Sequence, residues 1–357
     1  MSSESGDQPA AKGVDLASGI DHQVAMVMDL NKCIGCQTCS IACKELWTDS
    51  GGREYMYWNN VETRPGQGYP RNWEDKGGGW QEGNPQKRKD GEIPTQEDYG
   101  RPWDFPHESV LFQGSDEAVR PEGPDPQNGP NWDEDEGAGE YPNSYYFYLP
   151  RICNHCTHPS CVEACPRNAV YKRAEDGIVL IDQDRCRGYR YCVEGCPYKK
   201  IYYNAVKKTS EKCIFCYPRI KGDGPDGEIQ PNACAEQCPP QLRHVGFLDD
   251  EKGPIYKLVE EYEVALPLHP DFRTQPNVYY IPPTAPPQHS EDGERVDVDR
   301  IPPTYLEKLF GERVHDALAT IERHRERVEN GGSSELMEML QDKNPAQQYR
   351  LGVFNDD

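Results

Sequence analysis

The stretch Cys186–Pro197 reads CRGYRYCVEGCP, and its cysteine spacing indicates how the chain folds. Tyr189 stands where a Cys-x-x-Cys-x-x-Cys motif would have its middle thiol. This group and three others hold all the cysteines, which are Cys33, Cys36, Cys39 and Cys43; Cys153, Cys156, Cys161 and Cys165; Cys186, Cys192 and Cys196; and Cys213, Cys216, Cys234 and Cys238. The 15 cysteines are one fewer than four fully thiolate-bound four-iron clusters would need.

The spacing within the groups has a physical reason. A tight CxxCxxC loop wraps one cubic cluster, and a further cysteine followed by proline ligates the other cluster of a pair. Cys165, Cys196 and Cys238 are each followed by proline. The repeat therefore predicts paired clusters in ferredoxin-like modules. The missing thiol at Tyr189 predicts three 4Fe–4S clusters and one 3Fe–4S cluster, which would make the chain a carrier of electrons.

Zinc sites and disulfides account for the cysteines less well than clusters do. A tetrahedral zinc site is complete with four ligands and does not call for the CxxCxxCxxxC pattern. A disulfide framework suits short secreted chains, whereas this chain has 357 residues, an odd number of thiols and no secretion-signal pattern at residues 1–7. His155 and His158 lie among four thiols that already suffice for a cluster. We therefore expect both imidazoles to support the ligands or to lie at the surface.

The composition predicts a thin apolar core. Hydrophobic residues make up 35% of the chain, the mean hydropathy is −0.90, and Gly and Pro contribute 32 residues each. Clusters are therefore expected to replace part of the hydrophobic core. Because no apolar stretch approaches the roughly 18 residues of a membrane helix, we expect no span.

Charge is unevenly distributed along the chain. The net charge is −22, yet residues 151–221 contain 14 Lys and Arg against 7 Asp and Glu, which gives +7 there and −29 elsewhere. Thiolate-bound clusters are net anionic, so nearby cations stabilise them and raise their potential. A nucleic-acid-binding face is disfavoured, because the acidic remainder would repel phosphates. The acidic excess predicts a solvated surface adapted to concentrated salt, with an acidic docking face for a cationic partner as the second choice.

The fold is predicted to be α+β, with two ferredoxin-like iron–sulfur modules, a long irregular insertion and a C-terminal helical arm. The expected parts are a disordered tail at 1–21, a double ferredoxin-like core for four clusters at 22–50 and 150–250, an insertion contacting the core or a partner at 51–149, and a wrapping arm at 251–357. Aromatic residues in the insertion, such as Trp73 and Trp80, argue against a flexible linker.

Residue alternation and turn chemistry predict short strands near the cysteines. The expected strands are 22–28, 145–149, 201–206 and 244–247, with a hairpin formed by 169–173 and 178–181. Apolar residues at helical spacing predict a helix over about 303–329 and a second, short helix over 334–341. Neither a nucleotide-binding glycine fingerprint nor a catalytic triad pattern is present in the sequence, so no catalytic residue is predicted.

Six segments resemble the iron–sulfur β subunits of molybdenum enzymes, in the nitrate reductase branch of the dimethyl sulfoxide reductase family. They are NKCIGCQTC at 31–39, ICNHC at 152–156, DRCRGYRYC at 184–192, EKCIFCYPRI at 211–220, VETRPGQG at 61–68 and PNVYYIPP at 276–283. The resemblance covers roughly residues 22–285. It implies a non-catalytic subunit that relays electrons between a molybdenum-bis-guanine-dinucleotide catalytic subunit and a haem b subunit, membrane anchor or soluble carrier.

The resemblance also implies how the thiols are shared between clusters. The implied first set is Cys33, Cys36, Cys39 and Cys238, the second set is Cys43, Cys213, Cys216 and Cys234, the third set is Cys153, Cys156, Cys161 and Cys196, and the fourth set is Cys165, Cys186 and Cys192. The first three sets would each hold a 4Fe–4S cluster and the fourth a 3Fe–4S cluster. Many relatives have Trp at the position of Tyr189, and a phenol likewise offers no thiol.

Several alternatives stay open. A β subunit of the dimethyl sulfoxide reductase or formate dehydrogenase type would hold four 4Fe–4S clusters, which Tyr189 argues against. A free-standing polyferredoxin would be a different class of protein, but the insertion and the C-terminal arm favour a fixed partner. Nitrate is the first choice of substrate for the partner enzyme, and dimethyl sulfide, ethylbenzene, selenate and chlorate or perchlorate are alternatives. We expect co-export with the catalytic subunit to the outer face of the cell membrane, with the cytoplasmic side as the second choice.

Overall fold

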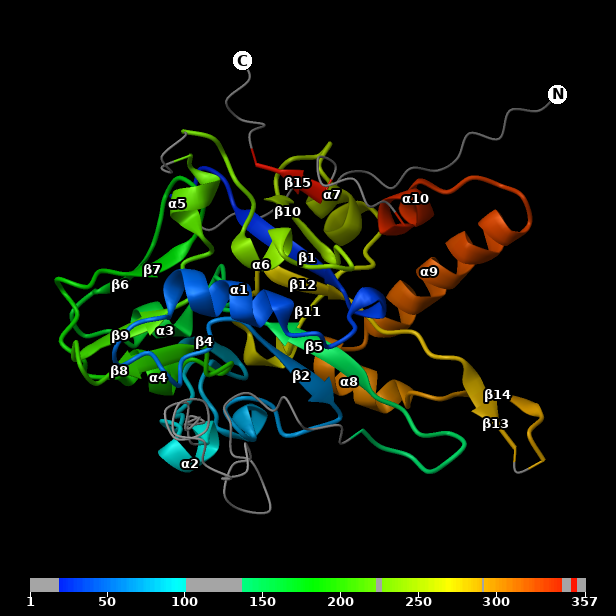
Figure 1. The fold of residues 1–357 in the computed structure, drawn as a ribbon, viewed down its shortest axis with the longest axis horizontal. Helices are drawn as coiled ribbons and strands as arrows, with labels where there is room; N and C mark the ends of the chain where they lie inside the picture. The colour runs from blue at the N-terminus through cyan, green and yellow to red at the C-terminus, as the bar shows by residue number, and fades with distance from the viewer. Residues whose placement is uncertain (1–18, 101–136, 223–226, 291, 342–347, 352–357) are drawn as a thin grey trace, which may run out of the picture.

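The computed structural model describes residues 19–100, 137–222, 227–290, 292–341 and 348–351. Helices and strands are mixed along the chain and mostly short, as the α+β prediction requires (Figure 1). The strands are β1 (Val24–Asp29), β2 (Asn60–Arg64), β3 (Trp80–Gln81), β4 (Asn84–Arg88), β5 (Phe147–Arg151), β6 (Val170–Lys172), β7 (Val179–Ile181), β8 (Ile201–Asn204), β9 (Thr209–Lys212), β10 (Arg243–Phe247), β11 (Leu266–Pro267), β12 (Val278–Ile281), β13 (Pro287–His289), β14 (Arg295–Asp299) and β15 (Tyr349–Arg350).

The helices are concentrated near the cysteine loops and at the end of the chain. The α-helices are α1 (Thr38–Trp47), α2 (Gln96–Tyr99), α3 (Ser160–Glu163), α4 (Tyr191–Gly195), α5 (Tyr217–Ile220), α6 (Ala233–Glu236), α7 (Pro254–Tyr256), α8 (Pro303–Phe310), α9 (Val314–Glu329) and α10 (Glu335–Gln341). Single turns of other helix types are η1 (Leu30–Lys32), η2 (Trp73–Asp75), η4 (Lys257–Glu261) and η5 (Pro270–Phe272). Most of the predicted tail, residues 1–18, and residues 101–136 of the predicted insertion lie outside the described residues.

A five-stranded sheet with the order β11-β12-β1-β10-β15 lies at the centre of the molecule (Figure 1). β1 runs parallel to β12 and antiparallel to β10. Strands from both ends of the chain therefore meet here, and the segment after residue 250 contributes β11, β12 and β15 to the sheet. All of β1 is buried, which fits its nearly continuous apolar sequence VAMVMD.

The two faces of β1 belong to different clusters of buried side chains. Val24, Met26 and Met28 point into the larger cluster, which contains most of the buried cysteines. Ala25 and Val27 point to the opposite side, into a smaller cluster formed by apolar residues of η4, α9 and α10. The alternation of side chains along a strand thus separates a thiol-rich layer from an apolar one.

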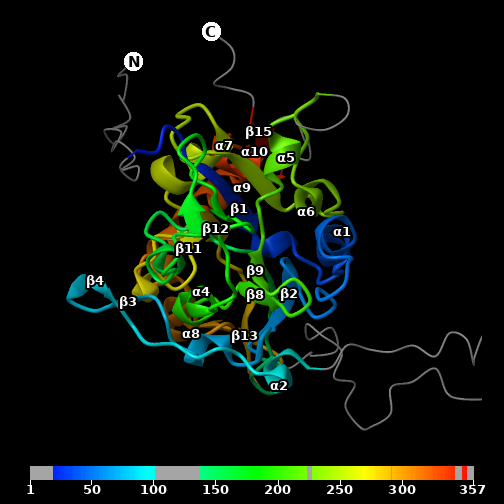
Figure 2. The same ribbon diagram turned by 90° about the vertical axis from the view of Figure 1, so that its left-hand side faces the viewer.

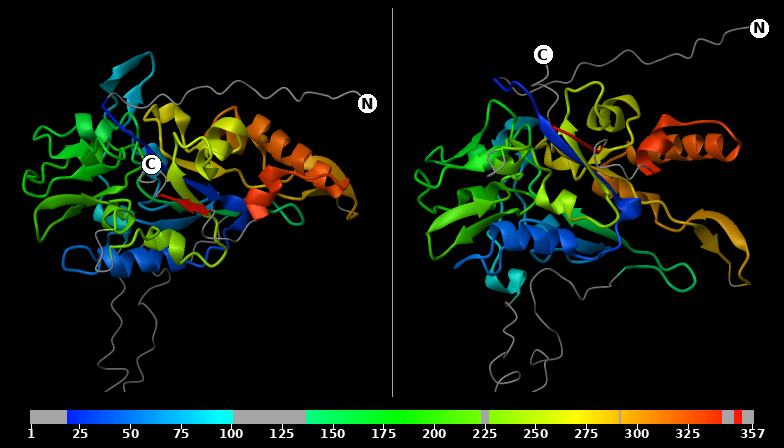
Figure 3. Two further views of the ribbon diagram at one scale, coloured as in Figure 1. Left: turned by 90° about the horizontal axis from the view of Figure 1, so that it is seen from above. Right: turned by 45° about the horizontal axis from the view of Figure 1, so that its top comes forward.

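Most of the predicted elements are confirmed. β1, β10 and the β6–β7 hairpin occur where expected, and α10 matches the predicted short second helix. The strand expected at 145–149 is displaced to Phe147–Arg151, and β8 pairs with β9, a strand that was not predicted. In two views the hairpins β6–β7 and β8–β9 lie at one end of the molecule, and α9, α10 and the β13–β14 hairpin lie at the other (Figures 1 and 3).

The prediction of one helix over 303–329 is wrong, because Gly311 divides the segment into α8 and α9. Gly311 has a φ of 78° and a ψ of 176°, a backbone conformation that is essentially restricted to glycine and that cannot continue a helix. Its N–H donates to the carbonyl oxygen of Glu307 at 2.8 Å and so closes the last turn of α8. The apolar spacing predicted the buried faces of the two helices correctly, but it did not indicate that the chain would leave the helix at this glycine.

The described part of the predicted insertion covers the cysteine layer rather than forming a separate domain. β2 pairs with β5, and the β3–β4 hairpin projects from the body of the protein (Figure 2). Trp73 and Trp80 are buried at 0% and 2% exposure, so these aromatic residues are part of the core. Among the described residues, no helix is both long enough and apolar enough to cross a membrane.

Candidate iron–sulfur site

All fifteen cysteines are free thiols, and twelve of them belong to or pack against the larger cluster on one side of the central sheet. Ten are buried, four are half-buried and only Cys36 is exposed. The short helices α1, α3, α4 and α6 carry one or two cysteines each, and the loops before them carry most of the rest. A thiol-rich interior without disulfides is suited to binding metal clusters.

The first loop of every cysteine group contains the same backbone turn. The residue two positions after the first cysteine has a positive φ in each case: Gly35 (68°), His155 (42°), Gly188 (65°) and Phe215 (55°). A left-handed residue between ordinary ones lets successive N–H groups face the same side, which favours an anion. Only two of the four positions are glycine, so the shared turn was not evident from the sequence.

The loops Cys33–Cys39 and Cys186–Cys192 correspond residue for residue. In both, the residue after the middle motif position has a positive φ, with 57° at Gln37 and 67° at Arg190, and the next residue begins a helix. Tyr189 therefore has the backbone position that a cysteine has in the other loop. Gly188 has little room for a side chain, because a Cβ there would lie 2.5 Å from the carbonyl oxygen of Lys208.

The thiols of the predicted second set lie together, although they come from the first and last groups. Burial raises the pKa of the Cys43 thiol well above its usual range, and neighbouring charges on Cys213, Cys234 and Cys216 raise it further. The backbone N–H of Phe215 donates to the Cys213 sulfur at 3.3 Å. A thiol must be deprotonated to bind a metal, so a buried group of this kind needs a nearby cation such as iron.

The third and fourth sets also come together. Burial raises the pKa of Cys161 well above its ordinary value, and Cys196, Cys153 and Cys156 raise it further. In the fourth set, burial raises the pKa of Cys192 to about 11, the nearby Ser210 side chain opposes this, and Cys165 and Cys186 add to it. N–H groups of Ala169 and Ser210 donate to the Cys165 and Cys186 sulfurs, both at 3.3 Å.

The first set is the most open of the four. Burial raises the pKa of Cys33 to about 12, the N–H of Gly35 opposes this, and Cys39 and Cys238 raise it further. Cys36 is the exposed thiol of the chain, and the Thr38 hydroxyl donates to its sulfur at 3.4 Å. The structure thus brings Cys238 from the last group into the first.

Tyr189 lines the same small pocket as the thiols of the fourth set. Its side chain is 57% exposed, so the ring borders the site and also reaches the surface. In the described ranges, no three His, Cys, Asp or Glu side chains converge tightly enough for a single metal ion. A cubic cluster is several atoms wide, and its ligands stand further apart than those of one ion.

The two histidines that invited a ligand role have other contacts. His155 is buried, the N–H of Val179 donates to its Nδ1 at 3.1 Å, and burial together with Lys212 and Lys172 holds its pKa well below the usual value. His158 stacks on Trp80 with ring centres 4.1 Å apart. Both imidazoles thus support the fold around the thiols.

The basic stretch 151–221 turns several of its cations inward. Lys199, Lys200 and Lys212 are at most 2% exposed, and their ammonium groups donate to backbone carbonyl groups. Burial lowers the pKa of Lys199 to about 8 and is the main cause that lowers that of Lys200 to about 7. These cations do not form a surface for nucleic acid, and they lie in the layer where anionic clusters would be held.

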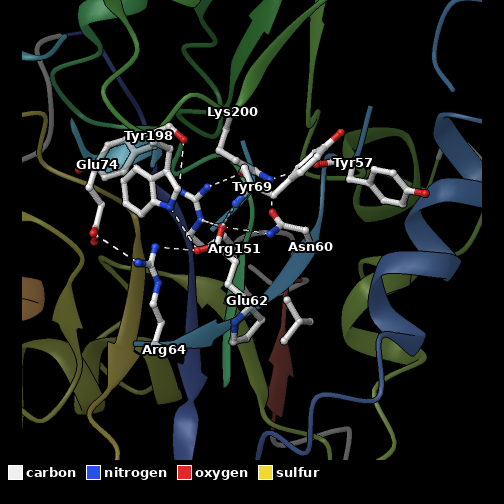
Figure 4. Close-up of polar contacts among 12 residues, drawn as sticks. Tyr57, Asn60, Glu62, Arg64, Tyr69, Glu74, Arg151, Tyr198 and Lys200 are labelled. Carbon is white, nitrogen blue, oxygen red and sulfur yellow. Dashed lines mark hydrogen bonds and ion pairs between the residues drawn. The ribbon is translucent and has the colours of Figure 1, made fainter. Parts of the chain in front are cut away.

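A buried network of charges fixes the insertion to this layer (Figure 4). The Glu62 carboxylate accepts from Arg151 Nε at 2.6 Å and from Arg64 Nη2 at 2.8 Å, and Trp73 Nε1 donates to it at 3.2 Å. Burial alone would raise the pKa of Glu62, but the two guanidinium groups, the Tyr69 N–H and the Asn60 side chain together outweigh burial and lower it to about 2. Asn60, on the same strand, accepts from Lys200 at 2.6 Å.

Two contacts to sulfur were missed by the sequence analysis. The indole Nε1 of Trp47 donates to the Cys216 sulfur at 3.1 Å. Arg243, the first residue of β10, donates from Nη1 to the Cys234 sulfur at a distance of 3.5 Å. The predicted strand began one residue later, at His244, so it did not include this arginine. A basic residue shortly after the last cysteine was the available signal.

The thiol sets and their buried cations define an iron–sulfur electron-transfer protein. Residues 144–248 match the family described as a 4Fe-4S dicluster domain. The chain is 76% identical to the respiratory nitrate reductase subunit beta of Haloferax mediterranei, over 97% of this chain and 98% of that one. It is also similar to the dimethylsulfide dehydrogenase subunit beta of Rhodovulum sulfidophilum (57% identity; 90% and 96% of the two chains) and to the selenate reductase subunit beta of Thauera selenatis (54%; 89% and 95%). The chain belongs to the family of iron–sulfur β subunits that includes those of respiratory nitrate reductases, which confirms the family predicted from its motifs.

Proposed function

We propose that this chain relays electrons for a nitrate-reducing molybdenum enzyme through three 4Fe–4S clusters and one 3Fe–4S cluster, held by the four thiol sets. When bound, these clusters supply single-electron carriers of graded potential. The chain's own residues hold the irons, exclude water from them and balance their charge. The 76% identity to a nitrate reductase subunit makes nitrate the first choice of substrate for the catalytic partner.

The observation that carries the proposal is the second set. Cys43 comes from the first cysteine group and lies among Cys213, Cys216 and Cys234 from the last group. Ligand exchange between distant groups is typical of two-cluster ferredoxins, in which the last cysteine of one run binds the other cluster. A set of separate zinc sites would have no need for this exchange.

Electrostatic interactions between the sets support a continuous path. The charge of Cys39 in the first set raises the pKa of Cys234 in the second set, and the charge of Cys153 in the third set raises the pKa of Cys213 in the second. The third and fourth sets are adjacent along the chain, because Cys192 of the fourth set lies on α4 and Cys196 of the third set caps the same helix. The order first, second, third, fourth follows.

The two ends of this path reach the surface. Beside the exposed Cys36 of the first set, Ile34 is 63% exposed. At the fourth set, Tyr189 and Tyr191 are exposed as well. We assign the first end to the molybdenum-bearing catalytic subunit and the fourth end to a haem b subunit or soluble carrier. The membrane's outer face, reached by co-export with the catalytic subunit, is the proposed location, with the cytoplasmic side as the second choice.

The experiment that tests this function is purification of the chain with its partners from its native source. We expect stoichiometric molybdenum, iron in the proportion of three 4Fe–4S clusters to one 3Fe–4S cluster, and viologen-linked reduction of nitrate. Chlorate, selenate and dimethyl sulfide are assayed in parallel, because relatives with 54–57% identity are named as subunits of a selenate reductase and a dimethylsulfide dehydrogenase. A stoichiometric complex without molybdenum, or a chain that purifies alone, would contradict the proposal.

The variant Tyr189→Cys tests the three-iron cluster. Because the loop around Tyr189 has the backbone of the Cys33–Cys39 loop, the new thiol should bind a fourth iron. We expect the oxidised three-iron electron paramagnetic resonance (EPR) signal to disappear, the potential of that cluster to fall and electron flow to slow. Tyr189→Phe, which adds no thiol, is the control and should keep the signal. A native complex without this signal, or an unchanged spectrum in Tyr189→Cys, would count against the assignment.

A further inference from the structure

Arg243 is a fully buried cation whose described partners include sulfur but no carboxylate. It is 0% exposed and lies opposite Met28 at the start of β10, next to the central strand β1. Nη1 donates to the sulfur atoms of Cys234 at 3.5 Å and Met26 at 3.6 Å, and Nη2 donates to the amide oxygen of Asn59 at 2.9 Å. Nε has no hydrogen-bond partner in the described structure.

The charges around Arg243 come from two thiol sets. Burial by itself would lower its pKa, yet Cys234 of the second set and Cys39 and Cys238 of the first set together raise it above the ordinary value. The direct contact of Arg243 with the Cys234 sulfur, and the packing of α6, which carries Cys234, against α1, which carries Cys39, place the guanidinium beside thiols of both the first and second sets. Its unpartnered Nε–H and its sulfur contacts fit an anionic iron–sulfur neighbour, because a buried cation needs compensating charge.

Arg151 shows what a purely structural buried arginine looks like in the same protein. Its guanidinium is bound by the Glu62 carboxylate at 2.6 Å and by the carbonyl oxygens of Tyr69 at 2.8 Å and Tyr198 at 3.2 Å. Such a neutral pair adds little net field to its surroundings. Arg243 has only the neutral amide of Asn59 and sulfur atoms as hydrogen-bond partners in the described structure, so its charge acts on the thiolates.

We propose that Arg243 is a positioning residue that sets the reduction potentials of the first and second clusters together, through one positive charge held between their thiolate ligands. The inference rests on the proposed function and its ligand sets. Reduction adds one electron to a cluster and makes it more anionic, so a fixed nearby cation favours the reduced state. Low solvent access strengthens the effect, because the charge is poorly screened.

The test is a redox titration of the purified complex, followed by EPR, in wild type and in three variants. Arg243→Gln removes the charge and should lower the potentials of the first and second clusters, while the third and the three-iron cluster keep theirs. Arg243→Lys retains the charge and should stay near wild type. Asn59→Asp places a carboxylate beside Arg243 without touching a thiol, and should lower the same two potentials by a smaller amount.

Iron content separates the possible outcomes. Wild-type complex without the expected clusters would overturn the proposed function itself. Clusters present in Arg243→Gln or Asn59→Asp at unchanged potentials would overturn only the inference on Arg243. A potential shift of equal size in all four clusters would also contradict it, because that result indicates a general loosening. If Arg243→Gln loses iron, the potentials of the first and second clusters in Asn59→Asp decide whether the inference holds. If both of these variants lose iron and Arg243→Lys does not, Arg243 is needed for cluster binding, and the inference on the potentials is overturned.

Discussion

The two faces of strand β1 are stabilised in different ways. Val24, Met26 and Met28 face a layer of thiols and buried charges, while Ala25 and Val27 face an apolar cluster with Ile321 and Leu336. The first layer contains Glu62, Arg151 and Arg243, whose charges would be costly without partners. The second needs only the burial of apolar surface. The comparison leads us to expect that one sheet separates a face stabilised by iron from a face stabilised by apolar burial alone.

The largest expected effect is that of iron removal. Treating the native complex with a chelator under reducing conditions should open the thiol layer, because buried thiolates lose their counter-ions and cluster binding is coupled to folding. Hydrogen exchange followed by mass spectrometry should rise strongly in α4, α6 and β8, and much less in α9 and α10. Equal increases on both faces would show that the division is wrong.

Glu62→Gln comes next in size. The substitution leaves the buried guanidinium group of Arg151 without its anion and Arg64 with only Glu74, at 3.3 Å, and breaking a buried ion pair costs about 3–5 kcal/mol. Because the folded pKa of Glu62 is about 2, below its ordinary 4.5, its contribution is complete above about pH 4.5 and is lost as pH falls toward about 2. Denaturant unfolding followed by tryptophan fluorescence at neutral pH measures the effect. A loss below about 1 kcal/mol would contradict the prediction.

Leu336→Ala probes the apolar face. Leu336 is fully buried on α10, and truncating a buried leucine costs about 2–5 kcal/mol. The unfolding free energy should fall while all cluster potentials stay at their wild-type values. A change in the potentials would mean that the two faces are coupled more closely than the structure indicates.

The smallest effect is expected for the exposed pair Glu322–Arg325 on α9. Its N–O distance is 2.6 Å, the same as that of Glu62–Arg151, but both side chains are more than 40% exposed. Water screens such pairs, so Glu322→Ala should cost about 0.2–1 kcal/mol in the same unfolding assay. A cost as large as that of Glu62→Gln would mean that distance rather than burial controls the energy.

Helices and strands could be predicted from the sequence where the spacing of apolar residues and the turn residues within the segment determine them. The strand β1, the β6–β7 hairpin and α10 follow from apolar spacing and turn residues. The prediction of a single helix over 303–329 failed at Gly311, whose positive φ and extended ψ interrupt the helix in spite of the continuous apolar pattern. The shared turn in the cysteine loops was hidden, because His155 and Phe215 adopt a conformation that sequence rules reserve for glycine.

The sequence by itself determined the four cysteine groups, the missing thiol at Tyr189 and the excess of cations between residues 151 and 221. Spacing carries this information because short loops fix which thiols can wrap one cluster. The family resemblance implied that Cys43 joins the thiols of the last group, and the tertiary structure brings these thiols together. Only the tertiary structure decided that Arg243 lies beside thiols of two sets. Contacts between residues so far apart in the chain depend on how the sheet packs β10 beside β1, and no local pattern encodes that pairing.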